Sequence, residues 1–311
     1  MGASETTREL VVPAPSDGAR LDVFLRDHLA GLGRAAVKRL IEDGRVTLDA
    51  RRASGRERVR AGQRVAVRGE IGAGALPDPS APLVIAYEDA ACVVANKPAG
   101  MPSHPLAPGE IGTLASALVA RFPEMANFGY SAREPGIVHR LDTDTSGLVL
   151  AARTPAAFSD LRAQLEAGSI DKRYLALCAG VPERIGVPLH AALSARGPRV
   201  HVQLDEGLAR GDMQSITTEI VRIVSTHAAG AFALIEVKAA RARRHQVRAH
   251  LAALGHPLAG DALYGGPSTP LLGRHFLHAG VLVFVPPGAP AALRVEAPLP
   301  SELSAVLTAA G

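Results

Sequence analysis

The segment from Gly136 to Leu148 contains residues whose types and spacing suit nucleophilic or acid–base chemistry. Asp142 follows a short apolar run, Ile137–Val138, and precedes a turn rich in Thr and Ser. A second apolar run begins at Leu148, so the carboxylate is expected between two buried strands, with Arg140 two residues before it. An Asp in a turn also caps its own turn through a side-chain hydrogen bond. The spacing alone leaves both roles open.

The positive charge of the chain is concentrated between residues 34 and 68. This segment holds eleven Lys and Arg residues and four Asp and Glu residues, a net charge of +7, whereas the whole chain carries +4. A basic segment on a nearly neutral remainder is the electrostatic footprint of a nucleic-acid-binding module. A solvated face with no partner is the alternative for any run of charge.

Two short helices and two strands are predicted in and before this basic segment. Apolar residues recur at helical spacing over residues 21–29 and 37–41. Gly44 is placed to end the second helix. Short strands are expected to follow at residues 45–48 and 64–68.

The second of these helices is expected to present a basic face, because Arg34, Lys38 and Arg39 project away from its apolar stripe. The segments Arg20–Leu25 and Gly33–Val46 resemble the S4 RNA-binding domain. That family often has Ser where the second segment begins with Gly, a residue that also caps helices. The resemblance implies that the three cations bind RNA.

The remainder of the chain contains more strand-like than helix-like segments. Strands are expected at residues 83–87, 92–96, 170–179, 215–224 and 232–239. Helices are expected at residues 113–122, 154–168 and 244–254. Because strands outnumber helices without regular β–α–β alternation, the pattern predicts a mixed, largely antiparallel α+β domain.

Four segments of this larger domain resemble the RluA/RluD-type pseudouridine synthases of ribosomal RNA. They are Asn96–Gly100 with His104–Pro105, Gly136–Leu150, Asp171–Ala176, and Arg243–Leu251 continuing through Gly255–Asp261 to Tyr264–Gly265. Together with the S4-like segment they follow the family's order over nearly the whole chain. The resemblance implies an α+β fold in which an S4-like RNA-binding domain precedes a catalytic domain with a bent, mainly antiparallel sheet and a central cleft. The expected parts are a flexible N-terminus at 1–17, the S4-like domain at 18–70, a linker at 71–80 and the catalytic domain at 81–311.

The same resemblance implies isomerisation of uridine to pseudouridine in RNA without cofactor or metal. Asp142 matches the family's catalytic Asp, and Arg248 matches the Arg that pairs with it. Tyr174 matches the Tyr that packs against the target base. The sequence leaves three roles open for the Asp: attack on the sugar, attack on the ring, or removal of a sugar proton.

Further residues are expected to contact RNA. Uracil inside folded RNA must be extruded before it can react, at a cost of a few kcal/mol. Arg140 matches the position from which the family's Arg takes part in flipping. Lys97 and His104 are expected to bind RNA or support the cleft wall, and His245 and Arg243 to contact RNA beside the cleft.

One departure from the family bears on substrate choice. The family usually reads Thr-Gly-Arg-Thr where this chain has Arg-Ala-Arg-Arg at 241–244, which adds positive charge beside the cleft. Large-subunit (23S) ribosomal RNA is the expected substrate, with transfer RNA as the alternative. A catalytically silent ribosome-binding protein is a second alternative. A glycoside hydrolase would need a second carboxylate about 5–10 Å from Asp142, and Asp144 is only two residues away.

Metal, membrane and disulfide chemistry are not expected. The late His residues do not have the spacing of a tight ligand set; they are His245, His250, His256, His275 and His278. The two Cys residues lie far apart in apolar runs, which indicates a reduced compartment. No apolar stretch approaches the roughly 20 residues of a membrane span. We expect a cytoplasmic monomer that binds RNA, with no DNA, membrane or cofactor.

Overall fold

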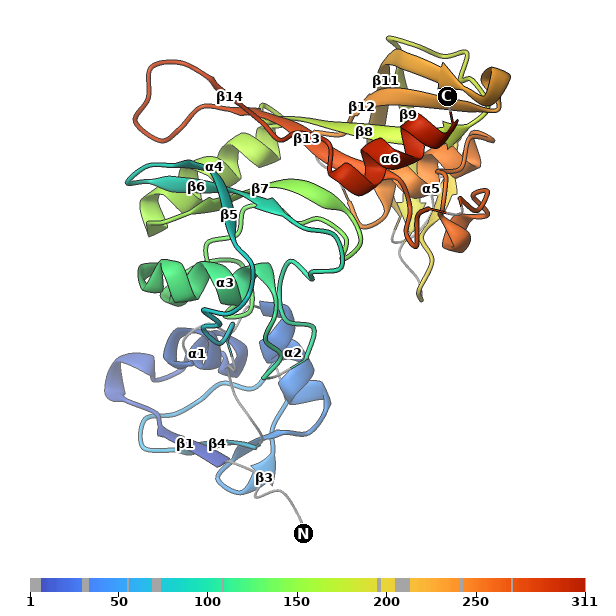
Figure 1. Cartoon of the computed structure of the whole chain (residues 1–311). Coiled ribbons are helices and arrows are strands. Elements are labelled where there is room, and N and C mark those ends of the chain that lie inside the picture. Colours follow the sequence, from blue (N-terminus) through green and yellow to red (C-terminus); the bar gives the residue numbers. More distant parts are fainter. Residues whose placement is uncertain are drawn as a thin grey trace. The chain divides into compact units, whose positions relative to one another are not determined.

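The structure is a computed structural model (Figure 1), which describes residues 7–29, 34–54, 56–68, 74–107, 109–194, 197–204, 213–240, 243–269 and 271–310. The chain forms two compact units. The first contains Met1–Ala81 and His104–Ile137, and the second contains Pro82–Ser103 and Val138–Gly311. The expected division assigned everything after residue 80 to one domain, whereas His104–Ile137 belongs to the first unit.

The first unit contains a four-stranded antiparallel sheet in the order β1-β4-β2-β3. Its strands are β1 (Thr7–Val11), β2 (Val46–Leu48), β3 (Arg51–Arg52) and β4 (Arg64–Arg68). Two helices accompany it, α1 (Leu21–His28) and α2 (Arg34–Glu42). The two predicted helices and the two predicted strands at 45–48 and 64–68 are therefore confirmed to within three residues.

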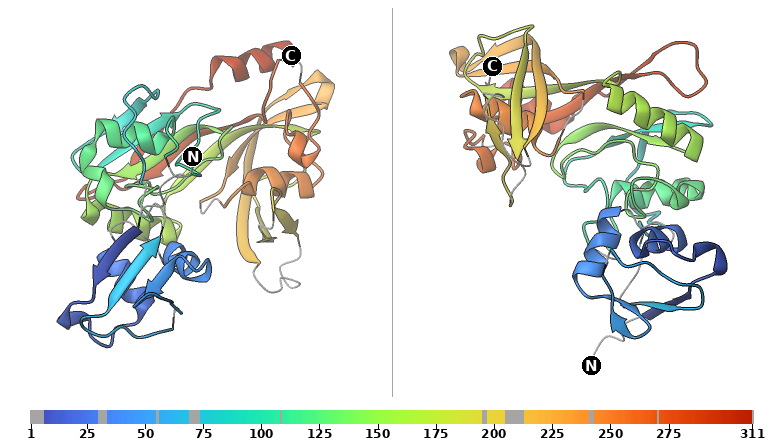
Figure 2. Two further views of the ribbon diagram at one scale, coloured as in Figure 1. Left: turned by 90° about the horizontal axis from the view of Figure 1, so that it is seen from below. Right: turned by 180° about the vertical axis from the view of Figure 1, so that it is seen from behind.

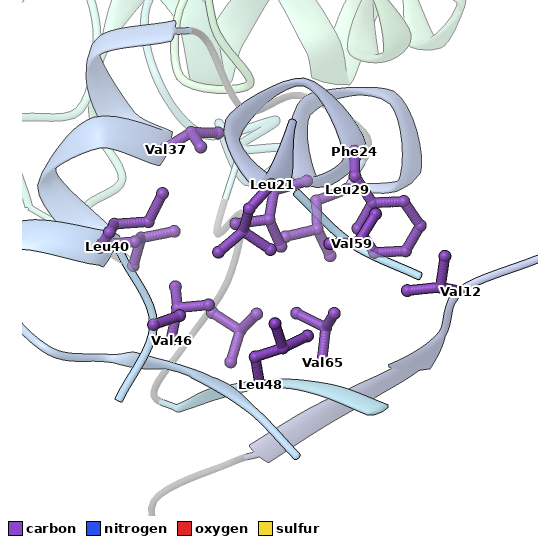
Figure 3. Close-up of a cluster of buried hydrophobic side chains, with 14 residues drawn as sticks. Val12, Leu21, Phe24, Leu29, Val37, Leu40, Val46, Leu48, Val59 and Val65 are labelled. Atoms are coloured by element: carbon purple, nitrogen blue, oxygen red, sulfur yellow. The ribbon is translucent and has the colours of Figure 1, made fainter. Parts of the chain in front are cut away.

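The core of this small sheet follows from the apolar spacing. Leu21, Phe24 and Leu25 recur at helical intervals on α1 and are buried. On β4, Val65 and Val67 alternate with exposed or partly exposed neighbours, as a half-buried strand requires. Figure 3 shows the helix side chains directed toward those of the strands, with no polar group among the labelled residues. The helices are thus stabilised mainly by packing one apolar face against the sheet.

The segment His104–Ile137 of the first unit contains α3 (Leu114–Arg121) and a short 3-10 helix (Pro123–Asn127). Thr113 caps α3, because its side chain accepts a hydrogen bond from the Ser116 amide. Asp78 accepts a hydrogen bond from the amide of Gly112 at 3.0 Å. This bond holds the segment before α3 to the chain that follows the small sheet.

The second unit is dominated by a ten-stranded sheet in the order β10-β9-β11-β12-β8-β13-β7-β6-β5, with β14 paired to β13. The strands are β5 (Val84–Glu88), β6 (Cys92–Lys97), β7 (Ser146–Ala152), β8 (Asp171–Ala179), β9 (Pro188–Ser194), β10 (His201–Gln203), β11 (Gln214–His227), β12 (Phe232–Lys238), β13 (Leu277–Phe284) and β14 (Leu293–Glu296). Of the described strand pairs, only β13 with β7 is parallel. The predicted mixed α+β class is confirmed.

Three helices belong to this unit, α4 (Pro155–Ala167), α5 (Gln246–Ala253) and α6 (Ser301–Ala310). Helix α4 contacts β7, and α5 contacts β10 and β11, toward the other end of the sheet (Figures 1 and 2). Helix α6 was not predicted; it buries Leu303 and Val306 against Leu177 of β8 and Leu234 of β12. Among the described residues, no helix is long and apolar enough to cross a membrane.

A glycine permits the parallel contact between β7 and β13. Gly147 has a φ of +119°, and a Cβ atom at this position would lie 2.3 Å from the carbonyl oxygen of Ala279. A side chain therefore has no space at this position, and the backbone conformation is one that residues other than glycine rarely adopt. Because Gly147 lies five residues after Asp142, this contact also fixes the end of the loop that carries the carboxylate.

We predict that Gly147→Ala lowers the free energy of unfolding by at least about 2 kcal/mol, since strain and a backbone clash act together. Urea unfolding of the full chain measures the loss. Gly273→Ala is the matched control, because a Cβ at Gly273 meets nothing within 4 Å. Equal stability of the two variants would contradict the prediction.

Candidate active site

A pocket in the second unit brings together residues from distant parts of the sequence. It is lined by the loop Arg140–Asp142, by Thr145, by Arg243 and His245–Arg248 at the start of α5, by Tyr174 of β8 and by Leu277 of β13. The structure therefore places all three residues expected to be catalytic, Asp142, Tyr174 and Arg248, in one pocket. Three residues expected to bind RNA also line it: Arg140 and Arg243, which are exposed, and His245, which is partly buried.

A buried guanidinium joins two carboxylates at the base of this pocket. Arg248 donates from Nε and Nη2 to the two carboxylate oxygens of Asp261 at 2.7 and 2.8 Å, and from Nη1 to Asp142 Oδ2 at 3.3 Å. Arg248 is 7% exposed and Asp261 is 2% exposed. A bidentate pair fixes the plane of the guanidinium as well as its position. Asp261 therefore holds Arg248 so that its remaining edge faces Asp142.

Tyr174 lies on β8 and is 3% exposed. Burial raises the pKa of its phenol, and the negative charge of Asp142 raises that pKa further. The phenol is consequently protonated at neutral pH, and it offers the pocket a hydrogen-bond donor and an apolar ring surface.

His245 has an unusual backbone conformation at the start of α5. Its φ is +54°, in the left-handed region, which costs a non-glycine residue roughly 1–3 kcal/mol. Its Nδ1 lies 3.0 Å from the hydroxyl of Tyr264, and its Nε2 lies 3.9 Å from Asp142 Oδ2. The Tyr264 hydroxyl accepts a hydrogen bond from the Val200 amide at 2.9 Å, which leaves its proton for His245 Nδ1. This network directs the opposite ring nitrogen of His245 toward Asp142.

His245 is also kept largely uncharged. Burial lowers its pKa, the charge of Asp142 opposes that shift, and the charge of Arg248 adds to it. The guanidinium of Arg248 lies over the Tyr264 ring, 5.3 Å from its centroid. Tyr264 thus supports both neighbours of the carboxylate.

Lys97 occupies a structural position. It is fully buried, and its ammonium donates to the carbonyl oxygens of Pro98, Met101 and Thr143 at 2.9, 2.7 and 2.9 Å. Burial lowers its pKa to about 7, while the charges of Asp142 and a neighbouring Asp oppose that shift. With its donors directed inward, Lys97 binds the loop of Asp142. Of its two expected roles, these contacts favour support of the cleft wall and not an RNA contact.

The three residues that end this loop are each held by a side chain from residues 274–278. The contacts are Arg274 Nη1 to Asp144 O at 2.9 Å, His275 Nε2 with Thr145 Oγ1 at 2.8 Å, and His278 Nδ1 with Ser146 Oγ at 3.0 Å. The buried His residues therefore have hydrogen-bonding roles. Among the described residues, no group of three or more His, Cys, Asp or Glu side chains is arranged to hold a metal ion.

Other residues expected to bind RNA lie outside this pocket. His104 belongs to the first unit, where its Nδ1 is 3.5 Å from Glu134 Oε1. Lys38 is exposed on α2 and lies 3.6 Å from Glu42. The side chains of Arg34 and Arg39 fall outside the described part of the structure, as do Gly33, Arg241 and Ala242.

Three residues of the site were missed from the sequence as functional residues: Asp261, Tyr264 and Arg274. Asp261 and Tyr264 stand within a segment that resembles the synthases, but the motif gives them no partner. A buried Asp in a loop has no periodicity that distinguishes it from an exposed turn residue. Their roles follow only from the distances to Arg248, His245 and the Asp142 loop.

Comparison with known proteins identifies the class of this site. The family model for RNA pseudouridylate synthase matches residues 91–253. An uncharacterized RNA pseudouridine synthase of Chloroflexus aurantiacus is 40% identical over 310 residues, covering 96% of this chain and 92% of the relative. Ribosomal large subunit pseudouridine synthase D of Neisseria meningitidis serogroup A is 32% identical over 323 residues, covering 98% of this chain and 83% of the relative.

A solved structure agrees with these relatives. Human RNA pseudouridylate synthase domain containing 1 is similar with a TM-score of 0.56 and 26% identity, covering 74% of this chain and 89% of that one. The chain therefore belongs to the RNA pseudouridylate synthase family, in its RluA/RluD-type group. It is an isomerase that makes pseudouridine in RNA.

We predict that Asp261→Asn lowers the turnover number at least about tenfold, because a neutral amide cannot provide the bidentate charged pair that orients Arg248. RNA affinity should change little, since Asp261 is buried below the pocket. Rates at saturating RNA and filter binding separate the two effects. Asp160→Asn, an exposed site on α4, is the control. A normal turnover number in Asp261→Asn would exclude this orienting role.

Acid should destabilise the chain partly through His275. Burial lowers its pKa to about 4 in the folded protein, below the ordinary value near 6.5. The unfolded chain therefore binds more protons between those values, so stability is fully present above about pH 6.5 and falls as the pH drops toward 4. His275→Gln should show a smaller loss of unfolding free energy between about pH 7 and pH 5 than the parent. His201→Gln, at an exposed site, should lose as much unfolding free energy as the parent over this pH range. The same dependence of unfolding free energy on pH in all three proteins would contradict the role of His275.

Proposed function

We propose that this synthase modifies uridines of large-subunit (23S) ribosomal RNA, with Asp142 as its essential carboxylate. The observation that most directly supports this role of Asp142 is its position in the pocket, where its Oδ2 pairs with Arg248 at 3.3 Å. Support for the substrate comes from relatives named ribosomal large subunit pseudouridine synthase D, which match 97–98% of this chain in the two bacteria Neisseria meningitidis and Xanthomonas campestris.

The geometry favours one oxygen of Asp142 as the reacting atom. Both side-chain contacts of the carboxylate, with Arg248 at 3.3 Å and with His245 at 3.9 Å, are made by Oδ2. No hydrogen bond to Oδ1 occurs among the described residues. We therefore assign Oδ1 to the substrate, where it acts on the ribose or on the uracil ring. Fixed partners on the other oxygen keep the carboxylate oriented without reorganisation during the reaction.

The reaction is redox-neutral and needs no external atom. The bond between carbon 1′ and nitrogen 1 breaks, the uracil turns within the pocket, and carbon 1′ joins carbon 5. One proton is lost from carbon 5 and one is gained at nitrogen 1. Tyr174 packs against the base throughout, and its neutral phenol is available to donate a hydrogen bond.

The basic residues supply RNA binding and base extrusion in this proposal. Arg140 is exposed at the rim of the pocket, so its side chain is free to occupy the space that the extruded uracil leaves in the RNA. Arg243 lies at the same rim and contacts the phosphate backbone. In the first unit, an S4-like domain over residues 18–70 adds affinity through the basic face of α2, on which Lys38 is exposed. Phosphate contacts of this kind give affinity that falls with salt.

We predict that Asp142→Asn abolishes pseudouridine formation and leaves RNA affinity close to normal. Asn keeps the size of the side chain but cannot carry the negative charge that attack or proton removal requires. Tritium release from RNA labelled at carbon 5 of uracil measures turnover, and filter binding measures affinity on the same protein. Asp144→Asn is the control, because Asp144 is exposed and does not line the pocket. Substantial turnover by Asp142→Asn would remove Asp142 from the mechanism.

The substrate is tested by mapping pseudouridines in total RNA from cells that carry either the parent chain or Asp142→Asn. We expect sites to disappear from 23S ribosomal RNA and from no transfer RNA. Loss of sites from transfer RNA alone would overturn the proposed substrate but not the enzyme class. Unchanged maps in a cell that makes folded Asp142→Asn as its sole copy would overturn the role of Asp142.

A further inference from the structure

A second cavity, of about 320 Å³, lies in the same unit as the active-site pocket. Its polar lining comes from alternate residues of β11, from the end of β12 and from the start of the α5 segment. The lining includes Ser215, Thr217, Glu219, Lys238, Ala240 and Arg243. Arg243 also lines the active-site pocket, so the two cavities meet at this side chain.

The side chains that line this second cavity include a carboxylate, which accepts hydrogen bonds, and two cations. Because side chains alternate across a strand, Ser215, Thr217 and Glu219 lie on one face of β11. Glu219 is partly buried and has no ion-pair partner among the described residues, although Lys238 stands opposite it in the strand register. Lys238 instead lies 3.7 Å from Asp171. A carboxylate without a partner inside a cavity is a strong acceptor for a ligand that presents N–H groups.

We propose that this cavity binds the base of a nucleotide adjacent to the target uridine in the same RNA, and that it prefers guanine. The inference rests on the proposed binding of the target uridine in the Asp142 pocket. The phosphodiester that links the two nucleotides then passes Arg243, the residue common to both cavities. The volume is at the lower end of the range for ligand pockets, as a single base requires.

The preference for guanine follows from the chemistry of the base edges. Guanine presents two neighbouring donors, N1–H and the N2 amino group, which pair with the two oxygens of a carboxylate. The Watson–Crick edges of adenine, cytosine and uracil each place an acceptor beside the donor, and that acceptor would face the negative charge of Glu219. Single-stranded RNA is commonly read in this way, by hydrogen bonds to splayed-out bases.

The test uses the full chain and a transcribed RNA fragment that contains a uridine found by the mapping experiment. Seven versions of the fragment, the native one included, carry each of the four bases at the position before that uridine or at the position after it. Tritium release gives kcat/KM for the parent, for Glu219→Gln and for Glu183→Gln, an exposed Glu outside both cavities. A base substitution also affects the folding of the RNA fragment, but this effect is the same for all three proteins. A difference in base preference between the proteins therefore comes from the cavity.

We expect the parent to prefer guanine at one of the two positions at least about fivefold, the lower range for bidentate recognition of a base. Glu219→Gln should reduce that preference below about twofold, because an amide offers one acceptor and one donor. Glu183→Gln should keep it. Ala240→Leu fills the cavity without altering Glu219, so it should also lose the preference for guanine. This variant tests the proposal if Glu219→Gln does not fold.

Two results would overturn the inference. One is a parent with no neighbour preference, and the other is a preference that both cavity variants retain. Absence of turnover on every fragment, with 23S sites present in the cellular map, would instead reject the uridine as a direct target of this chain. That result would remove the proposed function together with the inference that rests on it.

Discussion

The contact on which the active site depends is the buried guanidinium of Arg248 between Asp142 and Asp261. A buried charge without a partner costs several kcal/mol, so neither the Arg nor the buried Asp is stable there alone. Two carboxylates around one guanidinium leave an excess negative charge, and the enclosed ammonium of Lys97 lies near enough to interact with Asp142. The carboxylate of Asp142 therefore lies beside cations that the surrounding fold holds in place.

The sheet and its connections serve this arrangement of charges. Gly147 lets β7 approach β13 closely enough to pair in parallel, and that pairing brings residues 274–278 beside the end of the Asp142 loop. Arg274 and two uncharged His side chains then hold three consecutive loop residues. Neutral imidazoles suit this position, since a protonated ring could no longer accept a hydrogen bond and would add a cation to a buried site.

Much of the fold could be predicted because local signals determined it. Helix α4 has a Thr cap, Pro155 at its first position and Gly168 in the left-handed conformation after its end. Asp142, Tyr174 and Arg248 stand in recognisable motifs, and the structure brings all three into one pocket. In contrast, α6 and the assignment of His104–Ile137 to the first unit depend on packing between distant segments. Spacing along the chain carries no such information.

Two roles at the site could not be predicted for the same reason, because they depend on contacts between separate segments of the chain. Lys97 was expected either to bind RNA or to support the cleft wall, and the sequence did not decide between these roles. Three carbonyl oxygens satisfy its ammonium, and only one of them belongs to an adjacent residue. Asp261 was given no role because its partner, Arg248, precedes it by thirteen residues and across a turn. A motif identifies which residues react, whereas the residues that hold them in place are identified by hydrogen bonds that the sequence does not display.

This distinction also separates chemistry from target choice. Asp142, Arg248 and Asp261 are joined by hydrogen bonds, and Tyr174 is buried in the same pocket, so under the proposed function we expect a substitution among them to change the reaction whatever RNA is bound. Arg140 and Arg243 are exposed at the rim of the pocket, so we expect a substitution there to change the proposed RNA contact and to leave the buried charges in place. Under the proposed function, substitutions at the rim can therefore alter the choice of target and leave the buried charges undisturbed. Arg243, which belongs to the segment that departs from the family's usual Thr-Gly-Arg-Thr, lies at this rim.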